Sequence, residues 1–284
     1  MNKVLHLILA AVLLCGCAEE KVRVREDFND GWRFHLGDVP DAYAAGYDDS
    51  GWRELELPHD WAVEGDFSID NPSGTGGGAL PGGIGWYRKT FVAPENEADR
   101  VWRLEFDGVY MNSEVFVNGE SLGVRPYGYI SFGYDISPYL RWGEENVIAV
   151  RVDNVEQPNS RWYSGCGIYR NVWMLKTSEL CIPSDGLFCY LASMDMNRID
   201  RTPLARLNLD VKVKNCSDEQ KWYRYGLAIK DAEGRTVCSS PYTLSQPVSV
   251  NPGEEREHNW SDLQVPDPVL WDVDNPYLYT VIYS

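Results

Sequence analysis

Short runs in which apolar and polar residues alternate recur along the first 178 residues. The clearest are VWRLEF at 101–106 and NVIAVRV at 146–152, and a further run spans 86–91. Alternation places successive side chains on opposite faces of an extended chain, so each run predicts a half-buried β-strand. The run at 113–117 ends in Asn118-Gly119, a pair typical of a two-residue type I′ hairpin turn. Because no amphipathic helix of ordinary length interrupts these runs, the pattern predicts an all-β fold, either a β-sandwich or a jelly roll.

The last third of the chain has a pattern of its own. Residues 177–185 are polar and contain a proline, which is typical of a junction between domains. An apolar stripe then follows at 206–214, a hairpin turn at 231–234 and a strand-like run at 277–283. This spacing predicts an immunoglobulin-like β-sandwich. Because the sequence is still strand-like at Ser284, we expect this second sandwich to be truncated.

The first seventeen residues have the pattern of a targeting segment. A positive start at Lys3 precedes an apolar run at 5–14 that is too short to span a bilayer as a mature helix. The run ends in LCGC, which resembles a bacterial lipoprotein signal with Cys17 as the lipidated residue, and an ordinary secretory signal is the alternative. We expect a lipoprotein of the periplasm or outer-membrane surface of a Gram-negative bacterium, held to the membrane only by its lipid. The expected organisation is a signal peptide at 1–17, a jelly-roll domain at 22–178 and an immunoglobulin-like domain at 179–284.

One stretch, NSRWYSGCGIYRNVWM at 159–174, is too rich in special residues for a simple turn. The faces of Trp162 and Tyr163 suit the apolar face of a ring, and arginine and asparagine supply fixed hydrogen-bonding groups. Its two glycines allow a close backbone approach or a positive φ. The stretch is therefore a candidate binding loop, and the alternative is a sandwich-edge loop whose aromatic side chains fill the core.

Two further segments are candidates for the surroundings of a site. The glycine-rich residues 71–85 predict a long irregular loop, which either covers a groove or is a plain surface loop. It lacks the Gly-Lys-Ser/Thr ending of a phosphate loop, so nucleotide binding is not indicated. His59 and Asp60 are adjacent, and neighbouring side chains of an extended chain point to opposite faces. We expect one of them to brace a loop rather than the two to form an acid–base pair.

Composition narrows the range of partners. The formal net charge is −17, which argues against binding to nucleic acid or to anionic lipid and fits an uncharged substrate. The high aromatic content, 13%, suits β-structure and contact with carbohydrate. With four histidines and no CxxC pair, the sequence predicts neither a metal site nor a cofactor. The five cysteines after Cys17 indicate scattered thiols, with one or two disulfides as the alternative.

Several motifs in order resemble one family, glycoside hydrolase family 2. The resemblance covers essentially everything after Lys21 and is closest to bacterial β-galactosidases. The first domain is similar to the galactose-binding-like, N-terminal sugar-binding domain of that family, and the second to its immunoglobulin-like domain. The motifs that carry it are LPHDW at 57–61, PGGIGWYR at 81–88, FDGVYMNS at 106–113, PYGY at 126–129, DISPYL at 135–140, RWYSGCGIYR at 161–170 and PYLYT at 276–280.

The resemblance implies where catalysis would occur. In this family two catalytic glutamates lie on a (β/α)₈ barrel that follows these domains, and nothing in residues 1–284 predicts such a barrel. Asn96-Glu97 imitates the family's Asn-Glu dipeptide, but it lies in a polar turn between two strands. We therefore assign no catalytic residue to this chain.

The resemblance also implies a contribution to the sugar site. Related enzymes carry a carboxylate after the Gly-Ile-aromatic-Arg run, and Asn171 occupies that position here. An amide keeps the hydrogen-bonding capacity but loses the charge, which makes a sodium site doubtful; the alternative role of Asn171 is to cap its own loop. Asn171, Trp162, Tyr163 and Asp60 are the candidate substrate-binding residues.

We therefore expect the non-catalytic N-terminal part of a retaining family 2 hydrolase that acts on a β-galactoside or a related oligosaccharide. The missing barrel is its expected partner. One alternative is a free-standing carbohydrate-binding lipoprotein without catalysis, and another is a fragment that pairs with a separately encoded barrel.

Overall fold

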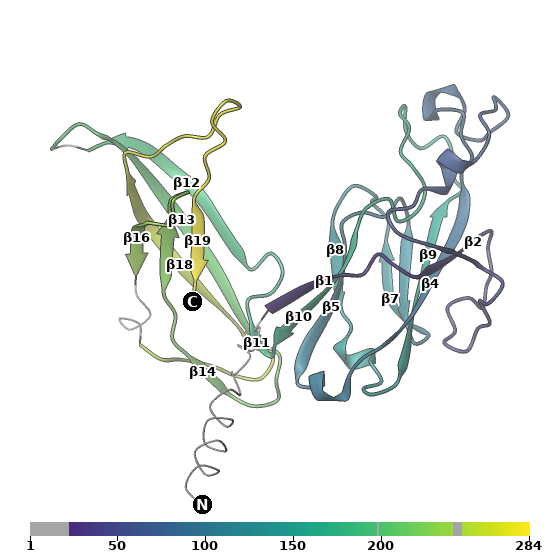
Figure 1. The fold of residues 1–284 in the computed structure, drawn as a ribbon, viewed down its shortest axis with the longest axis horizontal. Helices are drawn as coiled ribbons and strands as arrows, with labels where there is room; N and C mark the ends of the chain where they lie inside the picture. The colour runs from purple at the N-terminus through teal and green to yellow at the C-terminus, as the bar shows by residue number, and fades with distance from the viewer. Residues whose placement is uncertain (1–22, 198, 241–245) are drawn as a thin grey trace, which may run out of the picture. The chain divides into compact units, whose positions relative to one another are not determined.

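The computed structural model describes residues 23–197, 199–240 and 246–284 (Figure 1). In these residues the secondary structure is β-strand with short 3₁₀ turns and without α-helix, which confirms the expected all-β fold. The chain divides into two compact units, the first ending at Ser178 and the second beginning at Glu179. The targeting segment and Cys17 lie outside the described residues, so the lipid anchor stays a prediction. No helix among the described residues is long and apolar enough to cross a membrane.

The first unit, coloured purple to teal in Figure 1, is a jelly-roll sandwich of two antiparallel sheets. The larger sheet has six strands in the order β3-β2-β4-β9-β6-β7. Their bounds are Trp32–Leu36 for β2, Arg53–Leu55 for β3, Gly83–Val92 for β4, Ser113–Val117 for β6, Glu120–Arg125 for β7 and Glu145–Asn154 for β9. The predicted hairpin between β6 and β7 is confirmed, since Asn118 and Gly119 both have positive φ, as a type I′ turn requires.

The smaller sheet of the first unit has the order β1-β10-β5-β8. It consists of Arg23–Asp27 (β1), Arg100–Phe106 (β5), Phe132–Asp135 (β8) and Val172–Ser178 (β10). Between β8 and β9 lies a single 3₁₀ turn at Ser137–Tyr139 (η4). A second turn, Glu95–Glu97 (η3), connects β4 to β5.

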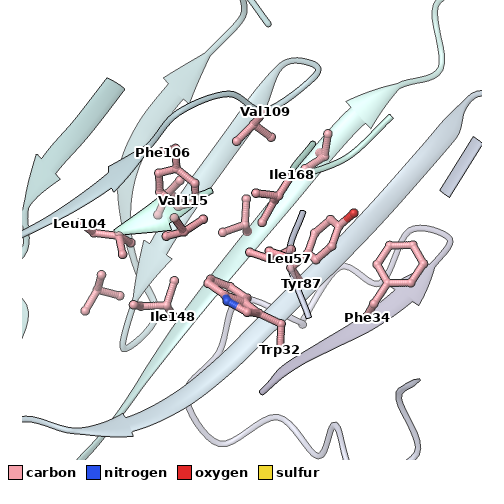
Figure 2. Packing of buried hydrophobic residues seen from close by; sticks show 14 of the residues in the cluster. Trp32, Phe34, Leu57, Tyr87, Leu104, Phe106, Val109, Val115, Ile148 and Ile168 are labelled. Atoms are coloured by element: carbon pink, nitrogen blue, oxygen red, sulfur yellow. The ribbon is translucent and has the colours of Figure 1, made fainter. Parts of the chain in front are cut away.

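Apolar and polar side chains alternate along the strands of both sheets, and the apolar side chains that face inward form the core between the sheets. Figure 2 shows Trp32, Tyr87 and Ile148 of the larger sheet packed in one cluster with Leu104 and Phe106 of the smaller sheet. All five side chains are fully buried. Each such side chain contributes about 1.5–3 kcal/mol relative to an exposed position. Leu57 and Ile168 reach the same cluster from loops, so the core also fixes the segments that carry the candidate site.

The outer face of the larger sheet is covered by residues 37–52. A small second cluster forms there around Trp86 and Phe116. Beside it, the guanidinium of Arg88 is buried and donates from Nε to Asp49 Oδ2 at 2.8 Å and from Nη1 to the carbonyls of Ala42 and Ala44. One buried cation thus holds the covering segment to the sheet.

The second unit, coloured green to yellow in Figure 1, is an immunoglobulin-like sandwich. Its long strand β13 (Pro203–Asn215) pairs with β11, β12 and β18, while β15 (Leu227–Lys230) pairs with β16 and β19. Leu209 and Val211 of β13 and Ile229 of β15 are fully buried in its core. The remaining strands are Leu180–Cys181 (β11), Leu187–Met196 (β12), Lys221–Tyr223 (β14), Thr236–Ser240 (β16), Val248–Val250 (β17), Glu255–Pro266 (β18) and Thr280–Tyr283 (β19).

None of the cysteines among the described residues is joined to another by a disulfide bond. These cysteines are Cys166, Cys181, Cys189, Cys216 and Cys238. Scattered thiols, rather than the alternative of one or two disulfides, therefore describe this fold.

Candidate functional site

The candidate site is built where two loop segments of the first unit run side by side. His59 N–H donates to the carbonyl of Ile168 at 2.8 Å, and Trp61 N–H donates to that of Cys166 at 3.1 Å. Residues 166–168 thus form a short backbone strip, here called the strip. On its other side, Tyr110 and Gly167 exchange a pair of backbone hydrogen bonds at 2.9 Å. Residues 166–168 are therefore fixed in the fold by backbone hydrogen bonds on both edges.

Two glycines make this close pairing possible. Gly165 and Gly167 have φ of +79° and +117°, a region that residues with a side chain rarely adopt. A Cβ on Gly167 would also collide with the hydroxyl of Tyr87, and it would lie 2.9 Å from the carbonyl oxygen of His59. Both functions that the sequence predicts for these glycines, positive φ and close backbone approach, are confirmed.

The carboxylate of Asp60 accepts hydrogen bonds from both of the segments that meet at the strip. It caps the 3₁₀ turn η1 (Trp61–Glu64), because its Oδ1 accepts from Ala62 N–H at 2.9 Å. The same oxygen accepts from Cys166 N–H at 2.8 Å, and Oδ2 accepts from the hydroxyl of Tyr163. Asp60 thus braces the loop, as the sequence predicts for one member of the His59–Asp60 pair. A role for it in sugar binding stays a prediction.

Tyr163 and Cys166 are held in their neutral forms. Burial, followed by the hydrogen bond to Asp60, raises the pKa of Tyr163 well above its ordinary value, so the phenol stays protonated and donates. Burial likewise raises the pKa of Cys166 to about 12. The thiol is therefore inert near neutral pH, and this part of the site contributes neutral hydrogen-bonding groups.

Trp162 has a very different environment from its neighbour. Its side chain is 79% exposed, whereas Tyr163 packs against the core cluster. Ser160 holds the turn by donating from Oγ to the carbonyl of Trp162 and by bonding with Ser164 Oγ at 2.9 Å. The indole is therefore an exposed aromatic surface on an internally bonded turn.

A small recess opens beside Trp162. Asn154, Gln157 and Asn159 line one part of it, and Ser73 and Gly77 line another. The amides form a network in which Gln157 Nε2 and Asn159 Nδ2 both donate to Asn154 Oδ1, at 2.8 and 2.6 Å. No lysine or arginine occurs among the described residues that line the recess. Its polar groups are neutral amides and hydroxyls.

The glycine-rich segment borders the same recess. It contains the 3₁₀ turn η2 (Thr75–Gly77), and a Cβ on Gly78 would lie 3.5 Å from the side chain of Tyr163. Its last residues differ from the expected loop, because β4 already begins at Gly83 and pairs there with Asn154. Gly85 is needed in that strand, since a Cβ would lie 2.6 Å from the ring of Trp61.

His59 points away from Asp60 into a polar cluster behind the strip. Arg53 Nη2 donates to His59 Nε2 at 2.7 Å, which leaves His59 Nδ1–H to donate to the hydroxyl of Tyr87 at 2.7 Å. Arg53 also pairs with Glu64 at 2.9 Å. Burial lowers the pKa of His59, against the opposing effect of Glu64. The imidazole is therefore a neutral structural link between the two segments.

Asn171 lies at the other end of the strip, with partners of its own. Its Oδ1 accepts from Asn29 Nδ2 at 3.3 Å, and its backbone carbonyl accepts from Asp107 N–H at 2.9 Å. Asn29 Oδ1 in turn accepts from Val172 N–H at 2.8 Å. These contacts tie Asn171 to two other segments of the first unit, and both roles expected for it, sugar binding and capping of its own loop, stay predictions. The structure thus joins Asp60 directly to Tyr163, places Trp162 beside them and gives Asn171 a separate environment.

The sequence analysis missed the amide network at the end of β9. Asn154, Gln157 and Asn159 are spread over six residues, and the fold brings them together with the segment 71–85. The available signal was the density of asparagine and glutamine in DNVEQPNS directly after a well-defined strand. Polar residues that follow a strand end are frequent in binding loops.

Glu97, the glutamate of the Asn-Glu dipeptide, lies far from the recess. It belongs to η3 and pairs with Lys176 Nζ at 3.3 Å. The ten-residue strand β4 begins at the recess and ends next to η3, which corresponds to about 30 Å of extended chain. The exclusion of Glu97 as a catalytic residue stays a prediction. Among the described residues, no group of three or more histidine, cysteine, aspartate or glutamate side chains could hold a metal ion.

Comparison with known proteins relates this geometry to characterised folds. Residues 26–178 match the family model described as "Glycosyl hydrolases family 2, sugar binding domain", and residues 193–284 match "Glycosyl hydrolases family 2". Among curated relatives, the beta-galactosidase BoGH2A of Bacteroides ovatus is 55% identical over 260 residues. That alignment covers 92% of this chain and 29% of the relative.

Solved structures agree in fold. A glycosyl hydrolase family 2 member from Bacteroides cellulosilyticus superimposes with a TM-score of 0.80 at 34% identity, covering 91% of this chain and 33% of that one. The beta-glucuronidase of Bacteroides uniformis also gives a TM-score of 0.80, at 26% identity, with coverage of 92% and 30%. The chain therefore spans about a third or less of the length of these relatives.

Proposed function

Because the chain belongs to glycosyl hydrolase family 2 and corresponds to its non-catalytic N-terminal part, we propose that its first unit shapes the sugar site of a β-galactosidase. In this proposal the two catalytic carboxylates of a retaining mechanism are supplied by the remaining two thirds of a family 2 hydrolase. Asp60, the carboxylate at the candidate site, already accepts three hydrogen bonds and acts as a brace. The role of residues 22–284 is then to position and to enclose the sugar.

The observation that carries the proposal is the neutral recess beside an exposed indole. A sugar ring has an apolar face, which suits Trp162, and hydroxyl groups, which suit the accessible amides of Gln157 and Asn159. A glucuronide carries a carboxylate, for which a cationic side chain is the usual partner. The uncharged lining, together with the 55% identity to a β-galactosidase, favours a galactoside over a glucuronide.

The test is to express residues 22–284 and to measure both turnover and binding on one sample. We expect no hydrolysis of a chromogenic β-galactoside, and weak binding of methyl β-galactoside that Trp162→Ala abolishes. Trp222→Ala is the matched control, because this tryptophan is 63% exposed in the second unit. Asn171→Ala and Tyr163→Phe then test the remaining candidate residues.

Each outcome has a definite meaning. Hydrolysis that Glu97→Gln abolishes would overturn the assignment of catalysis to other parts of the hydrolase. Equal loss of binding in the Trp162 and Trp222 variants would remove the recess as the sugar site. Absence of binding in the unaltered chain would reduce both units to a scaffold for the remainder of the hydrolase.

The expected cell location enters as a second part of the proposal. We propose that Cys17 is acylated and that the mature protein lies in the periplasm or at the outer-membrane surface. The support is the LCGC sequence after a short apolar run. Metabolic labelling with a fatty acid should mark the protein and not its Cys17→Ser variant, and equal labelling of both would refute the anchor.

A further inference from the structure

A second cluster of exposed aromatic side chains lies on the turn between β7 and β8. Tyr127 and Tyr129 are 58% and 52% exposed, and Ile130 beside them is 46% exposed. None of the contacts described above for the recess uses them. A contiguous group of large side chains that remain this exposed marks an interaction surface.

The turn that carries these tyrosines is locked in place. Gly128, between them, lies so close to the ring of Tyr110 that a Cβ on it would collide with that ring. The hydroxyl of Tyr169 donates to the carbonyl of Gly128 at 2.7 Å, and Asn112 N–H donates to that of Pro126 at 3.3 Å. The tyrosines therefore stand on a preformed support, which reduces the entropy lost when a ligand orders them.

The rings are arranged so that aromatic faces stay open. Tyr129 meets Tyr110 at a centroid distance of 5.3 Å and an interplanar angle of 63°, and it meets Tyr127 at 5.8 Å and 65°. An edge-to-face pair covers at most one face of one of its two rings. More than half of Tyr127 and Tyr129 is accessible, so a flat apolar ligand surface can stack there.

The support of this surface is linked to the candidate site by hydrogen bonds. The hydroxyl of Tyr110 donates to Asn159 Oδ1 at 3.2 Å, and Asn159 Nδ2 donates to Asn154 Oδ1 at 2.6 Å. Both asparagines line the recess beside Trp162. One chain of hydrogen bonds therefore connects the support of the tyrosines to the recess.

We propose that Tyr127 and Tyr129 form a platform for further sugar rings of an uncharged oligosaccharide whose terminal sugar stacks on Trp162 at the mouth of the recess. The inference rests on the proposed function and extends it, because it assigns an oligosaccharide rather than a single galactoside as the preferred ligand. Tyrosine suits such a ligand, since it combines an apolar face with a hydroxyl that can bond to sugar hydroxyls. The acidic chain, with its net charge of −17, favours an uncharged glycan over an anionic one.

The experiment compares two ligands on residues 22–284 by titration calorimetry. The ligands are lactose and an uncharged tetrasaccharide with terminal β-galactose. We expect the tetrasaccharide to bind more tightly, and Tyr127→Ala combined with Tyr129→Ala to weaken its binding by about tenfold, which corresponds to 1.4 kcal/mol. Lactose binding should remain unchanged. Tyr190→Ala is the matched control, because that tyrosine is 39% exposed on the second unit.

The two ligands separate failure of the platform from failure of the recess. If both ligands bind equally and the tyrosine variants change neither, the platform is refuted while the proposed recess stands. That result would assign the tyrosines to a protein contact. If neither ligand binds the folded chain, the recess and the platform are refuted together. Circular dichroism of each variant shows whether the sandwich is intact.

Discussion

At Gly167 the absence of a Cβ atom determines the local structure of the candidate site. The strip 166–168 approaches 57–61 and Tyr110 from both sides, and Tyr87 fills the space beneath it. A methyl group on Gly167 has no room, and its φ of +117° is unfavourable for any residue with a side chain.

We therefore expect Gly167→Ala to lower the free energy of unfolding by about 1–3 kcal/mol, the usual cost of an overpacked core position. Gly46→Ala is the control, because φ there is ordinary and no atom lies within 4 Å of an added Cβ. Urea denaturation followed by tryptophan fluorescence measures both. Equal stability of the two variants would contradict the close approach inferred at Gly167.

His59 gives a prediction about pH at the same scale. Its folded pKa lies below the ordinary value of about 6.5, chiefly because of burial; Arg53, Glu64 and Tyr87 face the ring, and the charge of Asp60 acts from the opposite side of the chain. A group whose pKa is depressed by folding contributes stability that is present above its unfolded pKa. That stability is lost as the pH falls through the folded pKa.

Unfolding at a series of pH values between about 7 and 5 should therefore show a steeper loss of stability in the unaltered chain than in His59→Gln. Glutamine can still bond to Tyr87 but does not titrate. Parallel pH curves for the two proteins would show that His59 is not the titrating group. His258→Gln is the internal comparison, because burial also lowers the pKa of that histidine in the second unit.

At the scale of elements, Arg88 shows how a strand and a covering segment depend on one ion pair. Asp49 accepts hydrogen bonds from two arginines, the buried Arg88 at 2.8 Å and the 42% exposed Arg33 at 2.6 Å. Replacement of Arg88 leaves Asp49 with only the more exposed arginine as its partner and removes the donor of the Ala42 and Ala44 carbonyls. The two arginines share their acceptor and differ in burial.

Arg88→Met should accordingly destabilise the first unit by about 3–5 kcal/mol. Arg33→Met should cost no more than about 1 kcal/mol, because exposed pairs contribute little. Chemical denaturation gives both values, and hydrogen exchange of residues 37–52 shows whether the covering segment has opened. Similar costs for the two substitutions would contradict the decisive role of burial.

The elements also show which parts of this structure are predictable from sequence. Strands such as β5 and β9 follow from local alternation, which needs no knowledge of the fold. The start of β4 at Gly83 does not, because pairing with Asn154 overrides a glycine-rich sequence that locally favours a loop. The amides Asn154, Gln157 and Asn159 and the locked tyrosines are likewise products of tertiary packing. Asp60 could be recognised as a brace, but its partners Tyr163 and Cys166 are about a hundred residues away along the chain.

At the scale of the whole molecule, the fold is established by comparison, whereas the substrate is a proposal. Two family matches and solved relatives at a TM-score of 0.80 establish the jelly-roll and immunoglobulin-like units. The chain covers 29% of the β-galactosidase that it resembles at 55% identity. Fold alone does not assign a reaction, so the substrate has to be argued from the recess and the platform.

The place of β10 in the smaller sheet has a consequence for synthesis of the protein. This strand, the last of the first unit, lies between β1 and β5, and Arg23 pairs with Thr177. Until residues 172–178 have left the ribosome, β1 and β5 have no strand between them and the smaller sheet cannot close. Pairing across such a long sequence separation is slow, because the loop has to close before the contacts form. The larger sheet, whose last strand ends at Asn154, can therefore form first, and the smaller sheet becomes complete only at the very end of the translation of this unit.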